Sequence, residues 1–250
     1  MKSYSQAFYA DRHAKTVHSA HTILSIVLQR IPQVSSAVDL GCGVGTWLSV
    51  LQEKGVKDVQ GLDGNWVDQN LLAIPRASFK QVDLANGDIR LPRRYDLAIS
   101  LEVAEHLPET RARDFVASLT ALSDFVLFSA AVPFQGGINH VNEQWQHYWA
   151  ALFAERGYAV HDIVRARIWD DSLIPFWYRQ NILLYSRHHH LPGAAEAGPA
   201  VALPAPMPLD VVHPEHYLAK ARAQDGVRRS FRVFGRSVRD YMWSKLGQTH

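Results

Sequence analysis

The side chains best suited to ligand chemistry begin in a glycine-rich turn. Asp39 closes a short apolar run and is followed by Gly41, Gly43 and Gly45, which gives the pattern D-x-G-x-G-x-G. Glycine allows backbone angles that Cβ forbids and lets a ligand approach the chain closely. A dinucleotide-binding fingerprint would have its third glycine at position 46, where this chain has Thr46. The pattern therefore predicts a ligand-binding strand-to-helix turn of another kind.

Two more carboxylates end the next apolar runs. Asp63 ends the run that begins at Val59, 24 residues after Asp39. This is near the spacing at which a carboxylate reaches the hydroxyl pair of a ribose. Asp83 ends the run that begins at Phe79. A carboxylate at such a position can also cap the helix that follows, and for Asp83 both interpretations stay open.

A second group of reactive side chains follows the fourth and fifth apolar runs. Glu102, Glu105 and His106 are spaced i, i+3, i+4, so a helical turn would place them on one face. His140 belongs to the loop of residues 133–145, and it could complete a mixed oxygen and nitrogen site for a metal ion. Glu102 could equally bind the cofactor or close the end of its strand.

His140 is also the first choice for a general base. An imidazole has an ordinary pKa near 6.5, so much of it is neutral at cellular pH and can accept a proton from a hydroxyl group. Gly136 and Gly137 allow the loop to fold over a substrate. The alternative is that His140 caps the next helix or lies on the surface. Glu105 and His106 are the other catalytic candidates, and for His106 structural support is the favoured role.

The elements that must position these groups alternate between strand and helix. Such alternation predicts an α/β fold with a mostly parallel, Rossmann-like sheet and helices on both faces. Strands are expected over 36–39, 59–64, 79–84, 95–102, 125–131, 160–168 and 177–185, and helices over 12–30, 46–54, 66–73, 109–122 and 142–156.

The glycine turn and the later features in register with it resemble the class I S-adenosylmethionine-dependent methyltransferases. The resemblance implies a seven-stranded sheet with an antiparallel last strand, and S-adenosyl-L-methionine as the cofactor. It also implies that Asp63 holds the ribose and that Asp83 meets the adenine amino group. The full set of cofactor-binding residues expected in this way is Asp39, Gly41, Cys42, Gly43, Gly45, Asp63, Gly64, Asp83, Leu84, Ser100 and Glu102.

The second group resembles a metal site. Glu102, Glu105 and His106, completed by His140, look like the site of small-RNA 3′-end methyltransferases and of ubiquinone-pathway O-methyltransferases. Both use a divalent ion to orient hydroxyls. The resemblance implies Mg²⁺ or Mn²⁺ at these four residues, where the ion would lower the pKa of the acceptor hydroxyl.

A narrower resemblance covers about residues 5–186 and concerns the substrate. The segments that carry it look like bacterial methyltransferases encoded with polysaccharide-building enzymes. It implies an O-methyltransferase acting on a sugar hydroxyl of a nucleotide sugar, glycolipid or growing glycan. A metal-dependent RNA 3′-end methyltransferase and a catalytically inactive cofactor-binding module are the alternatives. The segments are 12–20, 41–48, 100–108, 128–133, 136–149 and 168–171.

Composition favours a cytoplasmic enzyme with a small-molecule or glycan acceptor. Residues 220–250 hold eight Lys or Arg and two acids, so the rest of the chain, with 18 basic and 22 acidic residues, carries −4. This charge disfavours a nucleic-acid partner. No apolar run approaches the roughly 20 residues that span a bilayer, and the first 15 residues lack a signal-peptide core. The single cysteine, Cys42, suits a reducing compartment.

The end of the chain differs in composition from the body. The expected domains are a methyltransferase domain over 1–187, a Pro-rich linker or wrap over 188–214, and a basic amphipathic helical segment over 215–250. Six of the twelve prolines lie in the second of these. The helix could contact anionic lipid, or pack its apolar stripe on the same chain or on a second copy in a homo-oligomer. The packing interpretation is favoured.

Overall fold

The structure is a computed structural model that describes residues 6–86, 89–191, 207–224, 234 and 238. The chain divides into two units, residues 1–211 and 212–250. In the second unit the structure describes helix α7 (Pro214–Gln224). Of the basic amphipathic helical segment expected over 215–250, the part beyond α7 lies outside the described residues except for positions 234 and 238. None of the helices that can be described has both the length and the apolar character needed to cross a bilayer.

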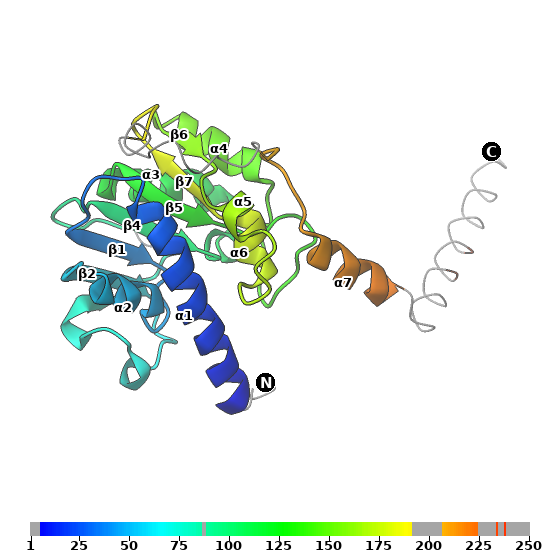
Figure 1. Ribbon diagram of the computed structural model, residues 1–250, viewed down its shortest axis with the longest axis horizontal. Coiled ribbons are helices and arrows are strands. Elements are labelled where there is room, and N and C mark those ends of the chain that lie inside the picture. Colours follow the sequence, from blue (N-terminus) through cyan, green and yellow to red (C-terminus); the bar gives the residue numbers. More distant parts are fainter. Residues whose placement is uncertain (1–5, 87–88, 192–206, 225–233, 235–237, 239–250) are drawn as a thin grey trace. The chain divides into compact units, whose positions relative to one another are not determined.

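The first unit is built on a seven-stranded sheet with the order β3-β2-β1-β4-β5-β7-β6 (Figure 1). Neighbouring strands run parallel except β7, which is antiparallel to both β5 and β6. The expected mostly parallel sheet with an antiparallel last strand is confirmed. The strands are β1 (Ser36–Leu40), β2 (Asp58–Asp63), β3 (Phe79–Gln81), β4 (Leu97–Leu101), β5 (Phe125–Ser129), β6 (Ala159–His161) and β7 (Leu183–Ser186).

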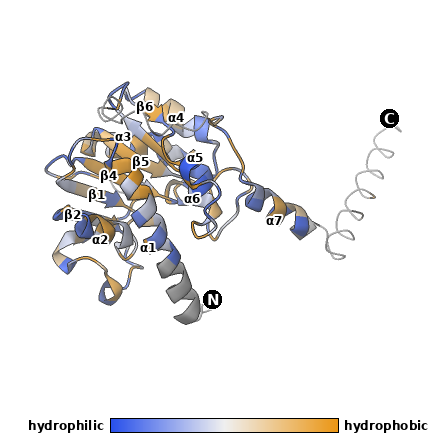
Figure 2. Cartoon of the chain, in the orientation of Figure 1, coloured by the Kyte–Doolittle hydropathy of each residue, from blue (hydrophilic) through white to orange (hydrophobic). Residues whose placement is uncertain are grey.

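Helices cover both faces of this sheet. One core packs α1 (Gln6–Leu28), α2 (Thr46–Glu53), α5 (Arg165–Ile168) and α6 (Phe176–Asn181) against side chains such as Ile99. The other packs α3 (Ala112–Leu122) and α4 (Gln146–Ala154) against side chains such as Val126. Strands β1, β4 and β5 are buried along their whole length because helices cover both faces of the sheet. Strands in such a position are nearly continuous apolar runs in the sequence. Figure 2 shows hydrophobic residues concentrated along β4 and β5.

Two expected strands are shorter than the sequence suggested. Residues 160–168 contribute only β6, because a short helix, α5, follows, and Asp162 Oδ1 accepts a hydrogen bond from the Arg165 N–H at 3.3 Å. The first part of 177–185 is helix α6, which directly follows Pro175. An aromatic run there packs into the core whether it is helical or extended, and periodicity over so few residues does not separate the two.

Two expectations for the segment between β2 and β4 also need correction. The predicted helix over 66–73 is a single 3₁₀ turn, Gln69–Leu71, and β3 ends at Gln81 rather than at residue 84. Further 3₁₀ turns lie at Arg76–Ser78, Ala104–His106 and Glu109–Arg111.

Residues 208–211 pack against α4 and α5. The buried Arg165 guanidinium donates to the carbonyls of Pro208 (2.9 Å) and Leu209 (2.8 Å). Gln146 Nε2 donates to Val211 O at 3.1 Å. Of the segment expected to be a linker or wrap, this end is therefore held on the first unit, while residues 192–206 lie outside the described part.

Candidate functional site

The carboxyl ends of the central strands open into a cavity of about 490 Å³. Its lining combines residues from the glycine turn, from the loop after β4 and from the loop after β5. Ligands of open α/β sheets bind at this edge. The lining residues are Gly41, Asp63, Trp66, Leu84, Ala85, Glu102, Val103, His106, Leu107, Ile138 and Asn139.

The turn after β1 requires glycine for two separate reasons. Gly41, Gly43 and Gly45 all have positive φ, at 87°, 54° and 84°. A Cβ on Gly41 would also lie 2.3 Å from Val103 Cγ2, inside any permitted contact. Cys42 is buried within the turn, and burial raises the pKa of its thiol. Its sulfur is therefore a packing group and not a nucleophile.

Asp63 is held by the backbone of the two turns beside it. Its Oδ2 accepts the Gly43 N–H and its Oδ1 accepts the Gly64 N–H, both at 2.6 Å. Each carboxylate oxygen has a second lone pair, so the side chain can accept further hydrogen bonds from a ligand in the cavity. Asp39 lies buried beside it, and burial followed by the charge of Asp63 raises the pKa of Asp39.

Asp83 and Ser100 lie differently from the sequence-based expectation. The exposed Asp83 carboxylate accepts from Ala85 N (2.9 Å) and from Asn86 N (3.2 Å) and Nδ2 (3.0 Å), and these bonds lower its pKa. These bonds close a turn and not the helix that a cap would need, and the contact of Asp83 with the adenine amino group stays a prediction. Ser100 is fully buried, and its Oγ donates to Leu40 O at 2.9 Å. Ser100 therefore ties β4 to β1 and does not line the cavity.

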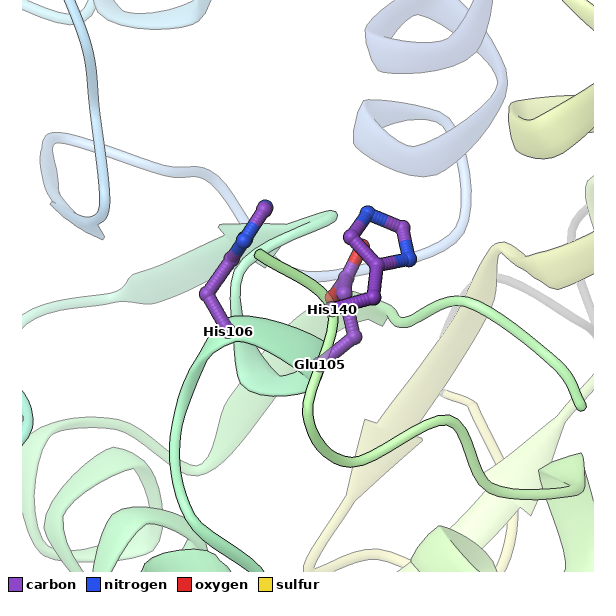
Figure 3. Close-up of side chains that lie close together, drawn as sticks. All are labelled: Glu105, His106 and His140. Atoms are coloured by element: carbon purple, nitrogen blue, oxygen red, sulfur yellow. The ribbon is translucent and has the colours of Figure 1, made fainter. Parts of the chain in front are cut away.

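Glu105, His106 and His140 come together beside the cavity, which His106 also lines (Figure 3). One potential ligand atom from each lies within 4.8 Å of the others. The contact depends on the backbone of the second loop, because Val141 N and Asn142 N both donate to Glu105 O, at 2.9 and 3.0 Å. The two imidazole rings meet edge to face with centroids 4.8 Å apart.

This cluster has acceptors without matching donors. Glu105 is completely buried, and neither of its carboxylate oxygens makes a hydrogen bond of ordinary geometry, although the backbone N–H groups of Glu105 and Ala131 act to lower its pKa. Burial, followed by the nearby charge of Glu102, raises the pKa of Glu105 well above its usual value. Burial, followed by His140, lowers the pKa of His106 and favours the neutral ring. Such a site can be satisfied by a proton or by a cation.

Glu102 stays outside this cluster, which corrects the expected four-residue set. Its φ is 56°, so the chain is not helical there, and the 3₁₀ turn begins only at Ala104. The Glu102 carboxylate accepts from Gln135 Nε2 at 2.9 Å and from Asn181 Nδ2 at 3.1 Å. Sequence reasoning missed both amides, since neither lies near Glu102 in the chain or in a recognisable motif.

Residues 10–194 match the family model described as "Methyltransferase domain". A comparison with curated protein sequences gives no match.

Three solved structures illustrate the fold similarity. A SAM-dependent methyltransferase from Archaeoglobus fulgidus is 14% identical, with TM-score 0.50, over 63% of this chain and 76% of that one. Magnesium protoporphyrin IX methyltransferase (ChlM) from Synechocystis PCC 6803 with bound SAM is 17% identical, with TM-score 0.49, over 75% and 87%. Streptomyces venezuelae DesVI is 25% identical, with TM-score 0.43, over 52% of this chain and only 58% of its own.

Proposed function

Since this chain belongs to the methyltransferase-domain family and is an S-adenosylmethionine-dependent methyltransferase, we propose that it methylates a hydroxyl group of a sugar, glycan or related small molecule. The observation that carries the proposal is that two groups of residues meet at one cavity. Asp63 and Gly41 of the glycine turn line the cavity, and His106, which also lines it, belongs to the acid–base cluster with Glu105 and His140.

The residues of the first group fit the cofactor. Asp63 keeps free lone pairs for the two ribose hydroxyls while its own charge is supported by two backbone N–H groups. Gly41 leaves the backbone open to close approach, and the buried Leu84 supplies an apolar wall. When bound, S-adenosylmethionine supplies an activated sulfonium methyl group. The protein must then hold the acceptor oxygen in line and remove its proton.

His140 is the residue to which we assign proton removal. In the alternative arrangement, Glu105, His106 and His140 together hold a divalent ion, which then takes over part of the role of the base. Carboxylate ligands suit Mg²⁺ and Mn²⁺, while imidazole ligands suit later transition metals, so two imidazoles and one carboxylate favour Mn²⁺ over Mg²⁺. An ion there would orient the hydroxyl and lower its pKa.

The charge of the cavity supports an uncharged acceptor. Among the described residues that line it there is no lysine or arginine, whereas Asp63 and Glu102 are both acids. Phosphate groups are usually held by Arg, Lys or helix N-termini. Two apolar side chains at the cavity, Trp66 and Ile138, are 74% and 67% exposed and could pack on the nonpolar face of a sugar or aglycone. These features favour a neutral hydroxylated compound over RNA. We also propose that the enzyme acts in the cytoplasm and in polysaccharide biosynthesis.

The test has two stages. Calorimetry of the full chain should show binding of S-adenosylmethionine and none of nicotinamide dinucleotides. A cell extract treated with the enzyme and the cofactor should then contain a product heavier by one CH₂, which mass spectrometry would detect. A methylated RNA 3′ end would establish the alternative function, and cofactor binding without any methylated product would support the inactive module. Turnover that EDTA leaves unchanged would exclude the metal.

A further inference from the structure

We propose that Glu143 is the positioning residue that fixes the tautomer and orientation of His140, so that Nε2 is the nitrogen that meets the acceptor hydroxyl. The structural part of this inference stands on the geometry of the loop alone. Its catalytic meaning rests on the proposed function. Glu143 lies in the segment 136–149 that carries the narrower resemblance, but the sequence assigned it no role.

One carboxylate oxygen of Glu143 has two partners. Oε1 accepts the Gly136 N–H at 2.6 Å and lies 2.9 Å from His140 Nδ1. Both side chains are well shielded, at 19% exposed for Glu143 and 12% for His140. A carboxylate in its ionised form only accepts hydrogen bonds, so Nδ1 must carry the proton in this pair. The second nitrogen, Nε2, then carries a lone pair.

Gly137 packs against the His140 ring. A Cβ on Gly137 would lie 2.1 Å from Nε2, so glycine at this position is what allows the ring to lie where it does. Figure 3 shows the His140 ring beside Glu105 and facing His106. His106 has a matching arrangement, because its Nδ1 lies 3.4 Å from the carbonyl of Asn139, which also only accepts. In both rings a proton on Nδ1 therefore leaves the lone pair on Nε2.

The arrangement suits proton removal during methyl transfer. As the acceptor O–H bond breaks, its proton forms a bond to Nε2 of His140. The oxygen lone pair forms the new bond to the methyl carbon while the carbon–sulfur bond breaks, with its electron pair remaining on sulfur. The positive charge carried by the sulfonium thus ends on the imidazolium. Glu143, hydrogen-bonded through Nδ1–H, faces that charge and stabilises it.

The tautomer can be measured without knowing the acceptor. We would record ¹⁵N spectra of the full chain with labelled histidine at about pH 8.5, well above the ordinary pKa of imidazole near 6.5. His140 and His106 would be assigned with His140→Gln and His106→Gln. Wild-type His140 should show protonated Nδ1 and unprotonated Nε2. Glu143→Gln keeps an oxygen able to accept both hydrogen bonds, so its pattern should match the wild type. Glu143→Ala should shift His140 towards the Nε2–H form that an unconstrained imidazole favours.

Two controls separate tautomer control from loop folding. His106 contacts the same loop through Asn139, so it should keep its signature in Glu143→Ala. Glu53→Ala removes the partner of His21, an exposed Glu–His pair at 3.1 Å, and should leave His140 unchanged. An unchanged His140 tautomer in Glu143→Ala overturns the proposal. Joint loss of both signatures in that variant also overturns it, because Glu143 would then order the loop without selecting the tautomer.

A turnover measurement adds the catalytic arm once an acceptor is found. Glu143→Ala should lower kcat roughly 10- to 100-fold, as removal of an outer partner of a functional histidine usually does, with cofactor affinity unchanged. If the wild-type enzyme transfers no methyl group, the proposed function fails while the tautomer assignment still stands or falls on the spectra.

Discussion

Asp63 and Glu105 occupy equivalent places at one edge of one sheet, yet their surroundings are opposite. Asp63 is the last residue of β2 and Glu105 lies in the 3₁₀ turn after β4, and both are buried, at 6% and 0% exposure. Asp63 receives two backbone N–H groups at 2.6 Å. Neither oxygen of Glu105 makes a hydrogen bond of ordinary geometry. The backbone thus supports the Asp63 carboxylate, whereas burial of Glu105 favours its protonated form or a bound cation.

This difference indicates how the two sides work. Hydrogen bonds from the backbone hold the Asp63 carboxylate in place, so its remaining lone pairs are positioned before a ligand binds. A buried carboxylate with little hydrogen bonding destabilises the protein unless it is neutralised. We therefore expect the site around Glu105 to take up a proton or a cation.

The largest effect is expected when the Asp63 carboxylate is removed. Asp63→Ala removes both hydroxyl contacts and leaves two backbone N–H groups without their acceptor. Hydrogen bonds to charged groups contribute about 1.5–3 kcal/mol, so S-adenosylmethionine affinity should fall roughly 100-fold. Calorimetry measures the change, with circular dichroism to establish that the variant is folded. An affinity within threefold of wild type would contradict the assignment of Asp63 to the ribose.

Much of the fold was predictable because its signals are local. The apolar runs of β1, β4 and β5, each buried from end to end, and the glycine turn that follows β1 predict a parallel α/β sheet. The aromatic start of 177–185 was not predictable as helix, because burial on the sheet suits either conformation.

The site was predictable only in part. The sequence predicted that Glu105 and His106 lie close together, because both come shortly after β4. The loop that carries His140 is held beside them by hydrogen bonds from Val141 N and Asn142 N to Glu105 O, and no sequence spacing indicates these bonds. Glu102 fails to join them because its backbone is left-handed and because distant amides bind it, one of them Asn181 on another element. Partners 33 and 79 residues away in the chain are products of the fold and leave no local signal.

The pH dependence of stability should also distinguish Glu105 from Asp63. Folding raises the pKa of Glu105 above 4.5, so the folded state binds more protons than the unfolded state at higher pH. Stability of the ion-free protein should be greatest, for this group, below about pH 4.5, and should fall as pH rises towards the folded pKa. The slope for one proton is at most about 1.4 kcal/mol per pH unit.

Glu105→Gln should remove that component and make the variant more stable than wild type near neutral pH. Urea unfolding in EDTA at a series of pH values measures it. Asp39 and Glu102 have pKa shifts of the same sign, so the difference between the two proteins is the informative quantity. Glu53→Gln, at a side chain that is 61% exposed, is the matched control. Parallel stability curves for wild type and Glu105→Gln would show that Glu105 is neutralised by a partner in the folded protein.

The smallest effect is expected at Asp83, and it tests whether a supported carboxylate must also bind ligand. Asp83 accepts three hydrogen bonds from Ala85 and Asn86, so its own turn already uses it, and it is exposed where Asp63 is buried. A contact with the adenine amino group from such a site competes with water and contributes about 0.5–1.5 kcal/mol at most. Asp83→Ala should therefore weaken S-adenosylmethionine binding by less than roughly tenfold, while Asp83→Asn, which keeps an acceptor for the turn, should bind almost as wild type.

Calorimetry of Asp83→Ala alongside Asp63→Ala gives the ratio of the two losses in affinity directly. Equal losses at the two positions would mean that the Asp83 carboxylate leaves its turn for the adenine, and that hydrogen bonding in the ligand-free protein does not distinguish the two acids.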